Sequence, residues 1–211
     1  MDCNDIDRII LVKASSALLM SKSIQLVGDF ISARRMYYGG VMKEKFSKYV
    51  GNIEYASGLE MKYVYMQLAE TDQQTADVLY KQKLYNQAVY FYIQSMEKKI
   101  KSCICEKVNM ELPFYANKLK EIGHSLDKSI VFLIEILSGN NVTLKTQLEK
   151  QLLVGVFENI RFLGLYNNCR YPKYVDKCEK YLVLHISEED CIRIKNISQK
   201  LDCFISDFYK I

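Results

Sequence analysis

The sequence predicts an all-α fold, an antiparallel up-and-down bundle of helices. Apolar residues recur at three- and four-residue spacing along most of the 211-residue chain, which is the period of one helix face. The chain has only 9 Gly and 2 Pro, too few for the frequent turns of a sandwich or a barrel. Its hydrophobic fraction of 49% and charged fraction of 26% are those of a soluble globular protein, which excludes disordered and fibrous classes.

Two long amphipathic helices are predicted one after the other in the middle of the chain. Ser57 and Glu60 have the spacing of a capping box, which predicts a helix running towards Leu79. Residues 81–83 are interpreted as a turn. The helix that follows has an apolar stripe at helical spacing: Tyr85, Ala88, Val89, Tyr92, Ile93, Met96, Ile100 and Ile104.

Four further segments complete the predicted bundle. Pro113 separates the long hairpin from a shorter helix that ends at Gly123. Ser125 begins the next helix, which the turn cluster at residues 138–141 ends. Thr143 is expected to cap one continuous helix with this apolar face: Leu144, Leu148, Leu152, Val156, Ile160 and Leu163. A second capping box, Ser187 with Asp190, predicts the last helix after an irregular, tyrosine-rich segment at residues 166–174.

The organisation of the chain is a bundle with an extension. Residues 58–211 are assigned to the bundle. Residues 1–57 are also apolar and helical in pattern, and we expect them to pack on the bundle because they are few for an independent domain.

Charge and cysteine content exclude several classes of function. The net charge of +4 does not by itself indicate nucleic-acid binding. Seven cysteines are an odd number, and the N-terminus lacks the pattern of a secretory signal, which predicts reduced thiols and a cytoplasmic protein. With two histidines, and with Cys103 and Cys105 separated by one residue, neither a metal site nor a cofactor site is expected. The apolar runs are too short for a membrane span.

Three segments, in this order, resemble the HEPN domain, a helical bundle found in many prokaryotic nucleotidyltransferase, toxin–antitoxin and defence systems. They are Ala88 followed by Gln94-x-x-Glu97-Lys98-x-x-Lys101, then Gly123-His124-Ser125-Leu126, then Arg170-Tyr171-Pro172. The resemblance covers about residues 58 to 211. It implies a helical bundle that forms a homodimer or binds a separately encoded nucleotidyltransferase.

Some proteins of that family resemble metal-independent ribonucleases, in which an Arg is followed four to six residues later by His. Here Arg161 is followed by Tyr166 and Asn167, and Arg170 by Tyr174 and Val175, without a histidine. Asparagine cannot act as a general base at neutral pH. The residues therefore favour a non-catalytic association module over an enzyme. An alternative is an atypical ribonuclease with Arg170 at the phosphate and His124 moving the proton.

Several side chains are candidates for a polar site. Glu97 and Lys101 are spaced for an ion pair on one helix, and a half-buried Glu97 could gain His124 or Arg170 as a partner. A nucleotide pocket of Glu97, Lys101 and Arg170 is a further alternative. Tyrosines interleaved with cations are typical both of a helix interface and of RNA contact; the binding candidates are Glu97, Lys98, Lys101, Tyr166, Tyr171 and Lys173. His185 is expected to be partly buried.

Overall fold

A computed structural model describes residues 55–208, except for the side chain of Phe208, and it confirms the all-α bundle. The predicted extension at residues 1–57 lies almost entirely outside this part of the chain. The helices are α2 (Met61–Lys81), α3 (Tyr85–Lys107), α4 (Pro113–Ile122), α5 (Leu126–Ser138), α6 (Val142–Glu149), α7 (Phe162–Asn168) and α8 (Glu188–Phe208). Short helical turns are η1 (Gly58–Glu60), η2 (Lys150–Val156) and η3 (Asp176–Cys178), and the strands are β1 (Lys173–Val175) and β2 (Lys180–Leu182).

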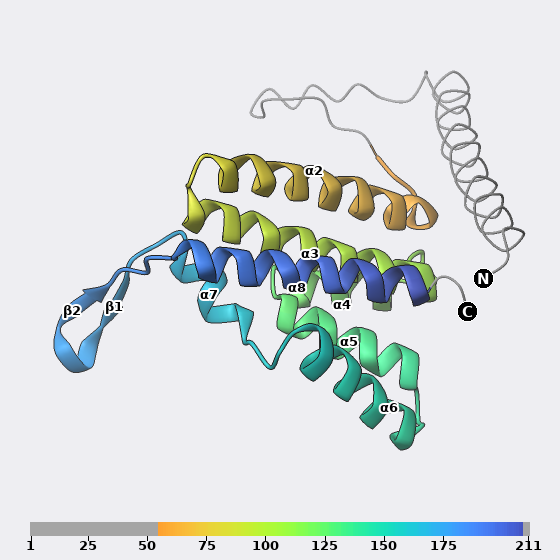
Figure 1. Ribbon diagram of the computed structural model, residues 1–211. Helices are drawn as coiled ribbons and strands as arrows, with labels where there is room; N and C mark the ends of the chain where they lie inside the picture. Colours follow the sequence, from red (N-terminus) through yellow and green to blue (C-terminus); the bar gives the residue numbers. More distant parts are fainter. Residues whose placement is uncertain (1–54, 209–211) are drawn as a thin grey trace, which may run out of the picture. The chain divides into compact units, whose positions relative to one another are not determined.

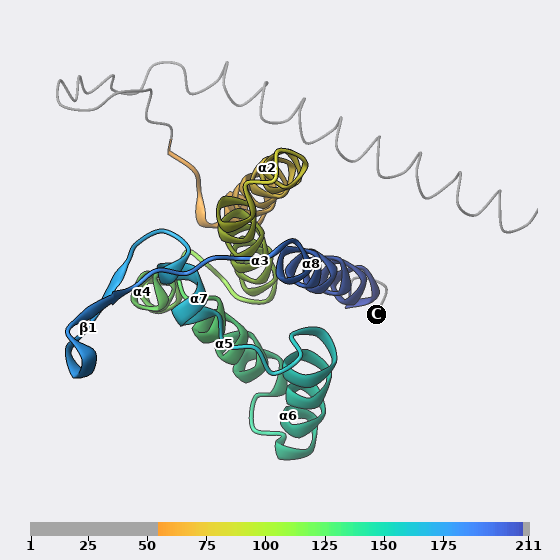
Figure 2. The same cartoon turned by 60° about the vertical axis from the view of Figure 1, so that its left-hand side comes forward.

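Helix α3 is the centre of the bundle. It packs against α2, α5 and α8, and Figure 2 shows these three helices around it. Almost every residue of α3 from Tyr92 to Cys105 is buried, polar residues included. A helix that is buried on all sides needs partners for its polar side chains. The neighbouring helices supply several of them: the Ser95 hydroxyl donates to the carbonyl oxygen of Ala69 on α2, and Lys99 pairs with Asp202 of α8.

The predicted starts and turns of the long helices are confirmed. Glu60 accepts hydrogen bonds from the backbone amide of Ser57 (2.8 Å) and from its hydroxyl (2.7 Å) just before α2. The turn between α2 and α3 holds Lys83 at a φ of 60°. At the start of α8, Ser187 and Asp190 form the second capping box, in which the Asp190 amide donates to Ser187 Oγ over 3.1 Å.

The single helix predicted from Thr143 to Leu163 is wrong. Asn141, not Thr143, caps α6, because its Oδ1 accepts a hydrogen bond from the amide of Leu144 at 3.0 Å. After α6 the chain widens into the π-helical turn η2, and it then leaves the helix where Glu158 and Asn159 have φ values of 52° and 56°. A left-handed conformation cannot continue a right-handed helix. Leu163, assigned to the buried face, is exposed.

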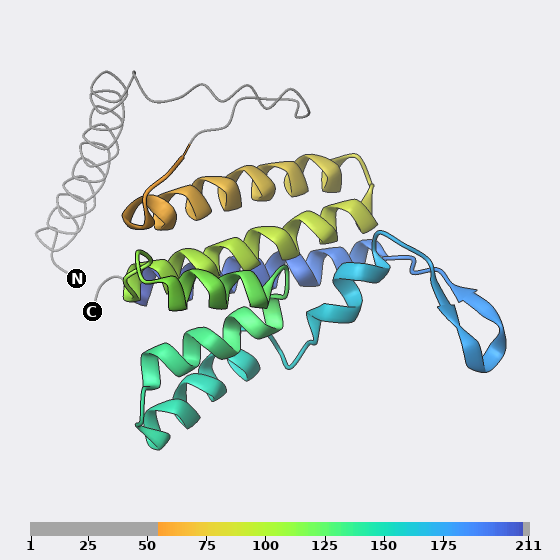
Figure 3. The ribbon, with the colours of Figure 1, turned by 180° about the vertical axis from the view of Figure 1, so that it is seen from behind.

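Strands β1 and β2 form an antiparallel hairpin that the sequence interpretation did not include. Tyr174 pairs with Tyr181 in its register, and η3 and Glu179, whose φ is 50°, make the connection between the strands. Figures 1 and 3 show the hairpin extending away from the end of the helices. Every residue of β2 is exposed, so the hairpin contributes little to the core.

Candidate functional site

The guanidinium group of Arg170 lies among three tyrosine rings. Its central carbon is 5.0 Å from the ring centroid of Tyr90, 5.8 Å from that of Tyr166 and 4.8 Å from that of Tyr171. The same group donates hydrogen bonds to Tyr171 Oη at 2.8 Å and to Tyr166 Oη at 3.4 Å. We call these four residues the Arg170 cluster. The π faces and hydroxyls fix the position of a cation that remains exposed to solvent.

The helices on which these tyrosines lie are held in place by the core. Tyr90 is on α3, and its ring stacks on Tyr166 of α7 with centroids 5.2 Å apart and planes 30° apart. The start of α7 is anchored by Asp127 of α5, whose carboxylate accepts hydrogen bonds from the amides of Phe162 (3.1 Å) and Leu163 (2.8 Å). A carboxylate at a helix N-terminus satisfies unpaired amides. The cluster is therefore preformed by the fold.

The hydroxyl of Tyr166 in this cluster is neutral at physiological pH. Burial raises the pKa of Tyr166 to about 12, with a contribution from the Tyr90 hydroxyl, although Arg170 acts in the opposite direction. A neutral phenol is both a donor and an acceptor. Within residues 55–208 no carboxylate lies within ion-pair distance of Arg170, and its guanidinium carries more N–H donors than the two phenols use.

The Arg170 cluster continues into the exposed side chains of the hairpin. Tyr174 and Tyr181 face each other across the strands, with ring centroids 5.2 Å apart. Tyr181 is 68% exposed and Val183 is 56% exposed. We define the hairpin surface as the Arg170 cluster together with Tyr174, Tyr181, Leu182 and Val183. Tyr90 and Tyr166 are partly buried, and the side chains of Tyr171, Tyr174, Tyr181, Leu182 and Val183 are exposed to water.

The predicted ion pair of Glu97 and Lys101 is present and is buried rather than exposed. Both side chains lie inside the bundle. Lys101 Nζ also donates to the carbonyl oxygen of Gly123 at 2.6 Å and lies 5.7 Å from the ring centroid of Tyr65. No hydrogen bond or ion pair in the described part of the chain joins Glu97 to His124 or Arg170. The structure thus does not form the polar cluster, or the nucleotide pocket, that those residues suggested.

The other candidate residues are distributed over the surface. His124 is exposed in the turn before α5, where Ser125 caps the helix by accepting from the Lys128 amide at 3.3 Å. Arg161 is exposed just before α7, and Lys173 is exposed on β1. Lys98 forms an ion pair with Asp72 of α2. His185 is also exposed, so its expected partial burial is wrong: it follows β2, outside the core.

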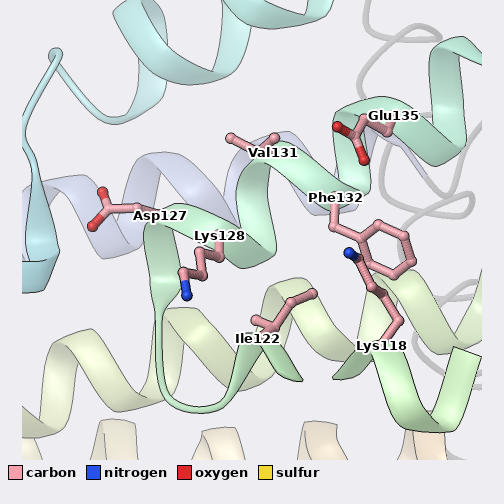
Figure 4. Close-up of a pocket in the computed structure, with 7 residues that line it drawn as sticks. All are labelled: Lys118, Ile122, Asp127, Lys128, Val131, Phe132 and Glu135. Carbon is pink, nitrogen blue, oxygen red and sulfur yellow. The ribbon is translucent and has the colours of Figure 1, made fainter. Parts of the chain in front are cut away.

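The described residues also form a groove between α4 and α5. It has a volume of about 310 Å³ and is open to solvent. Figure 4 shows its apolar floor and charged rim, which consist of Lys118, Ile122, Asp127, Lys128, Val131, Phe132 and Glu135. The Asp127 carboxylate already accepts a hydrogen bond at the start of α7. The groove brings together no pair of a nucleophile and a base.

Three thiols between residues 55 and 208 are held in their protonated form by burial. Burial raises the pKa of Cys105 to about 12 and the pKa values of Cys169 and Cys191 to about 11, so these groups stay protonated at neutral pH. Among the described residues no cluster of His, Cys, Asp and Glu could hold a metal ion. None of the helices between residues 55 and 208 is both long and apolar enough to cross a bilayer.

Comparisons of the chain with protein-family models, with curated proteins and with solved structures find no match. Sequence reasoning identified Arg170, Tyr166 and Tyr171 as candidates, but it missed Asp127 and the role of Tyr181. That the Asp127 carboxylate accepts hydrogen bonds from helix amides could have been predicted, because carboxylates often do so. Which helix it caps could not, because the amide of Phe162 lies 35 residues further along the chain.

Proposed function

We propose that this chain is a non-catalytic, HEPN-like helical module that associates with a second copy of itself through the hairpin surface. Support for the HEPN-like assignment comes from where the quoted segments lie. Glu97 and Lys101 occupy the buried helix α3, Ser125 opens α5, and Arg170 follows α7 directly. The resemblance likewise assigns these segments to a helix, to the start of a helix and to the residues just after one.

The observation that carries the proposal is the composition of the hairpin surface. Tyr and Arg are the residue types most enriched among the residues that dominate binding energy in protein interfaces. Here an arginine is already fixed against three tyrosines, and the adjoining hairpin exposes Tyr174, Tyr181, Leu182 and Val183. Because the arginine is held in place before binding, association loses little side-chain entropy.

Light scattering during size-exclusion chromatography tests this association under reducing conditions. We expect the full chain to elute as a dimer at micromolar concentration and Tyr181→Ser to weaken the dimer at least about tenfold. Tyr55→Ser is the matched control, because Tyr55 is 84% exposed and lies outside the hairpin surface. A wild-type chain that is monomeric throughout, or a dimer that both variants weaken equally, would contradict the proposal.

Contact with single-stranded RNA is a second candidate function, favoured by the unused N–H donors of Arg170. Exposed tyrosine rings stack on bases, and guanidinium groups pair with phosphates. Fluorescence anisotropy with a mixed RNA pool tests it, with incubation of the same pool to detect cleavage. This candidate predicts binding that falls with salt and is lost in Arg170→Ala but not in Arg161→Ala. Cleavage lost in both Arg170→Ala and His124→Ala would instead support the ribonuclease alternative.

A further inference from the structure

Helix α7 is too short, and too poor in helix-forming residues, to be stable by itself. It has seven residues, Phe162–Asn168, whereas isolated helices shorter than about 12–15 residues are marginal in water. Gly164 lies in its interior, and Asn167 and Asn168 lie in its last turn; both residue types are weak helix formers. Phe162 is the only residue of α7 that is fully buried. Contacts made at the two ends of α7 therefore decide whether it forms.

The contact at the N-terminal end of α7 is made by Asp127 of α5. The amide of Phe162 lies 3.1 Å from each carboxylate oxygen of Asp127, and the amide of Leu163 lies 2.8 Å from Oδ2. These amides have no acceptor within their own helix, and a negative charge at this end also favours the helix dipole. Arg161 precedes the helix and makes no side-chain cap. Asp127 therefore supplies the cap that the adjoining residue does not.

The contact at the C-terminal end of α7 is made by the Arg170 cluster. Tyr166 of α7 stacks on Tyr90 of α3, and its hydroxyl accepts a hydrogen bond from Arg170 Nη1 at 3.4 Å. The backbone amides of Arg170 and Tyr171 both donate to the carbonyl oxygen of Asn167 over 3.1 Å. Such bonds satisfy a carbonyl that has no donor within the helix. The last turn of α7 and the Arg170 cluster therefore form together.

We infer that α7 is a coupling helix, through which Asp127 controls the affinity of the hairpin surface for a second copy. This inference rests on the proposed self-association and specifies a positioning residue for it. Where α7 is unfolded, Tyr166 no longer holds Arg170, and the hairpin surface lacks its fixed cation. Only molecules with a folded α7 then associate, so the apparent dissociation constant of the dimer rises as the folded fraction of α7 falls.

The coupling acts in both directions, because linked equilibria are reciprocal. Association at the hairpin surface favours the folded α7 and so stabilises the hydrogen bonds that Asp127 accepts. Asp127 itself is on α5 and is not part of the hairpin surface. A substitution of Asp127 therefore removes no contact with the second copy and acts on the dimer only through α7.

Removal of the Asp127 carboxylate tests the coupling. We expect Asp127→Ala to raise the dissociation constant of the dimer about three- to tenfold, because α7 loses its N-terminal cap. Light scattering over a concentration series measures this constant. Glu135→Ala is the matched control and should change the constant less than about twofold. Glu135 is an exposed carboxylate of the same helix, about two turns beyond Asp127.

A second substitution within α7 tests whether the helix carries the effect. No atom lies near a Cβ added at Gly164, so Gly164→Ala raises the helix propensity of α7 without a clash. In the Asp127→Ala background it should tighten the dimer by up to about fivefold. In the wild type it should change the dissociation constant less than about twofold, because the cap already keeps α7 folded.

Hydrogen–deuterium exchange distinguishes this coupling from a general loss of stability. In Asp127→Ala the amides of Phe162–Asn168 should exchange faster than in the wild type and slow again at high protein concentration, whereas the amides of α3 should not change. A wild-type dimer that Asp127→Ala leaves intact, or a weakened dimer that Gly164→Ala does not restore, would overturn the coupling and leave the proposed function standing. A monomeric wild type would overturn the proposed function itself.

Discussion

The contribution of the Glu97–Lys101 ion pair to stability depends on its burial and not only on its spacing in the sequence. An i,i+4 pair of Glu and Lys on a solvent-facing helix contributes only a few tenths of a kcal/mol. Here Glu97 and Lys101 are both inside the bundle, where two charges are tolerated only when each has a partner. Lys101 also binds the carbonyl of Gly123 and so links α3 to the turn before α5. The pair thus connects two elements of the core.

Removal of one partner of this pair should therefore be costly. We expect Lys101→Met to lower the free energy of unfolding by about 3–5 kcal/mol, because it leaves Glu97 buried without a counter-ion. Urea denaturation measures the change. Lys118→Met is the control, since Lys118 and Glu121 form an exposed pair, and its effect should stay within about 0.5 kcal/mol. Equal effects of the two substitutions would show that the buried pair has no special role.

At the residue scale the sequence predicted the Glu97–Lys101 ion pair, but not the contacts between residues that are distant in the chain. The spacing of Glu97 and Lys101 indicated an ion pair, and Arg170 and Tyr166 were identified as candidates. A half-buried Glu97 was expected, but full burial of the pair was not predictable, because it depends on α2 and on the turn at Gly123, which are distant in sequence. Likewise, the stacking of Tyr90 on Tyr166 joins residues on α3 and α7, and periodicity within one helix contains no information about it.

At the scale of elements, capping residues predicted helix starts well, and periodicity predicted helix ends poorly. Ser57, Ser125 and Ser187 were each correctly placed before a helix. The break after η2 was missed because the apolar spacing continues across it, from Leu152 to Ile160. The hairpin was missed because its strands are three residues long and mostly exposed, so they lack the alternation of a half-buried strand.

Substitutions of two glycines test the assigned end of α5 and the interior of α7. Gly139, which ends α5, has a φ of 50° and a ψ of −123°, a conformation that is strained for any residue with a Cβ. Gly139→Ala should cost about 1–3 kcal/mol of unfolding free energy. Gly164 lies inside α7 with no atom near an added Cβ, so Gly164→Ala should stabilise by up to about 1 kcal/mol. Thermal unfolding of both variants is the measurement, and a stabilising Gly139→Ala would contradict this assignment.

At the scale of the whole molecule, the described bundle combines a closed core with an exposed projection. The core around α3 buries charged and apolar side chains alike. The hairpin of β1 and β2 instead extends beyond the end of the helices (Figure 1), and its Tyr174 and Tyr181 side chains are exposed. Exposed apolar and aromatic groups gathered in one place mark interaction sites in soluble proteins. The architecture thus separates the part that provides stability from the part that we propose to bind a second copy.

The most direct test of this account is hydrogen–deuterium exchange of the full chain at low and high protein concentration. If two copies associate through the hairpin surface, exchange of amides in residues 171–186 should slow as concentration rises, while amides lining the groove between α4 and α5 should not change. Exchange that is independent of concentration along the whole chain, or slowed only outside residues 171–186, would contradict it.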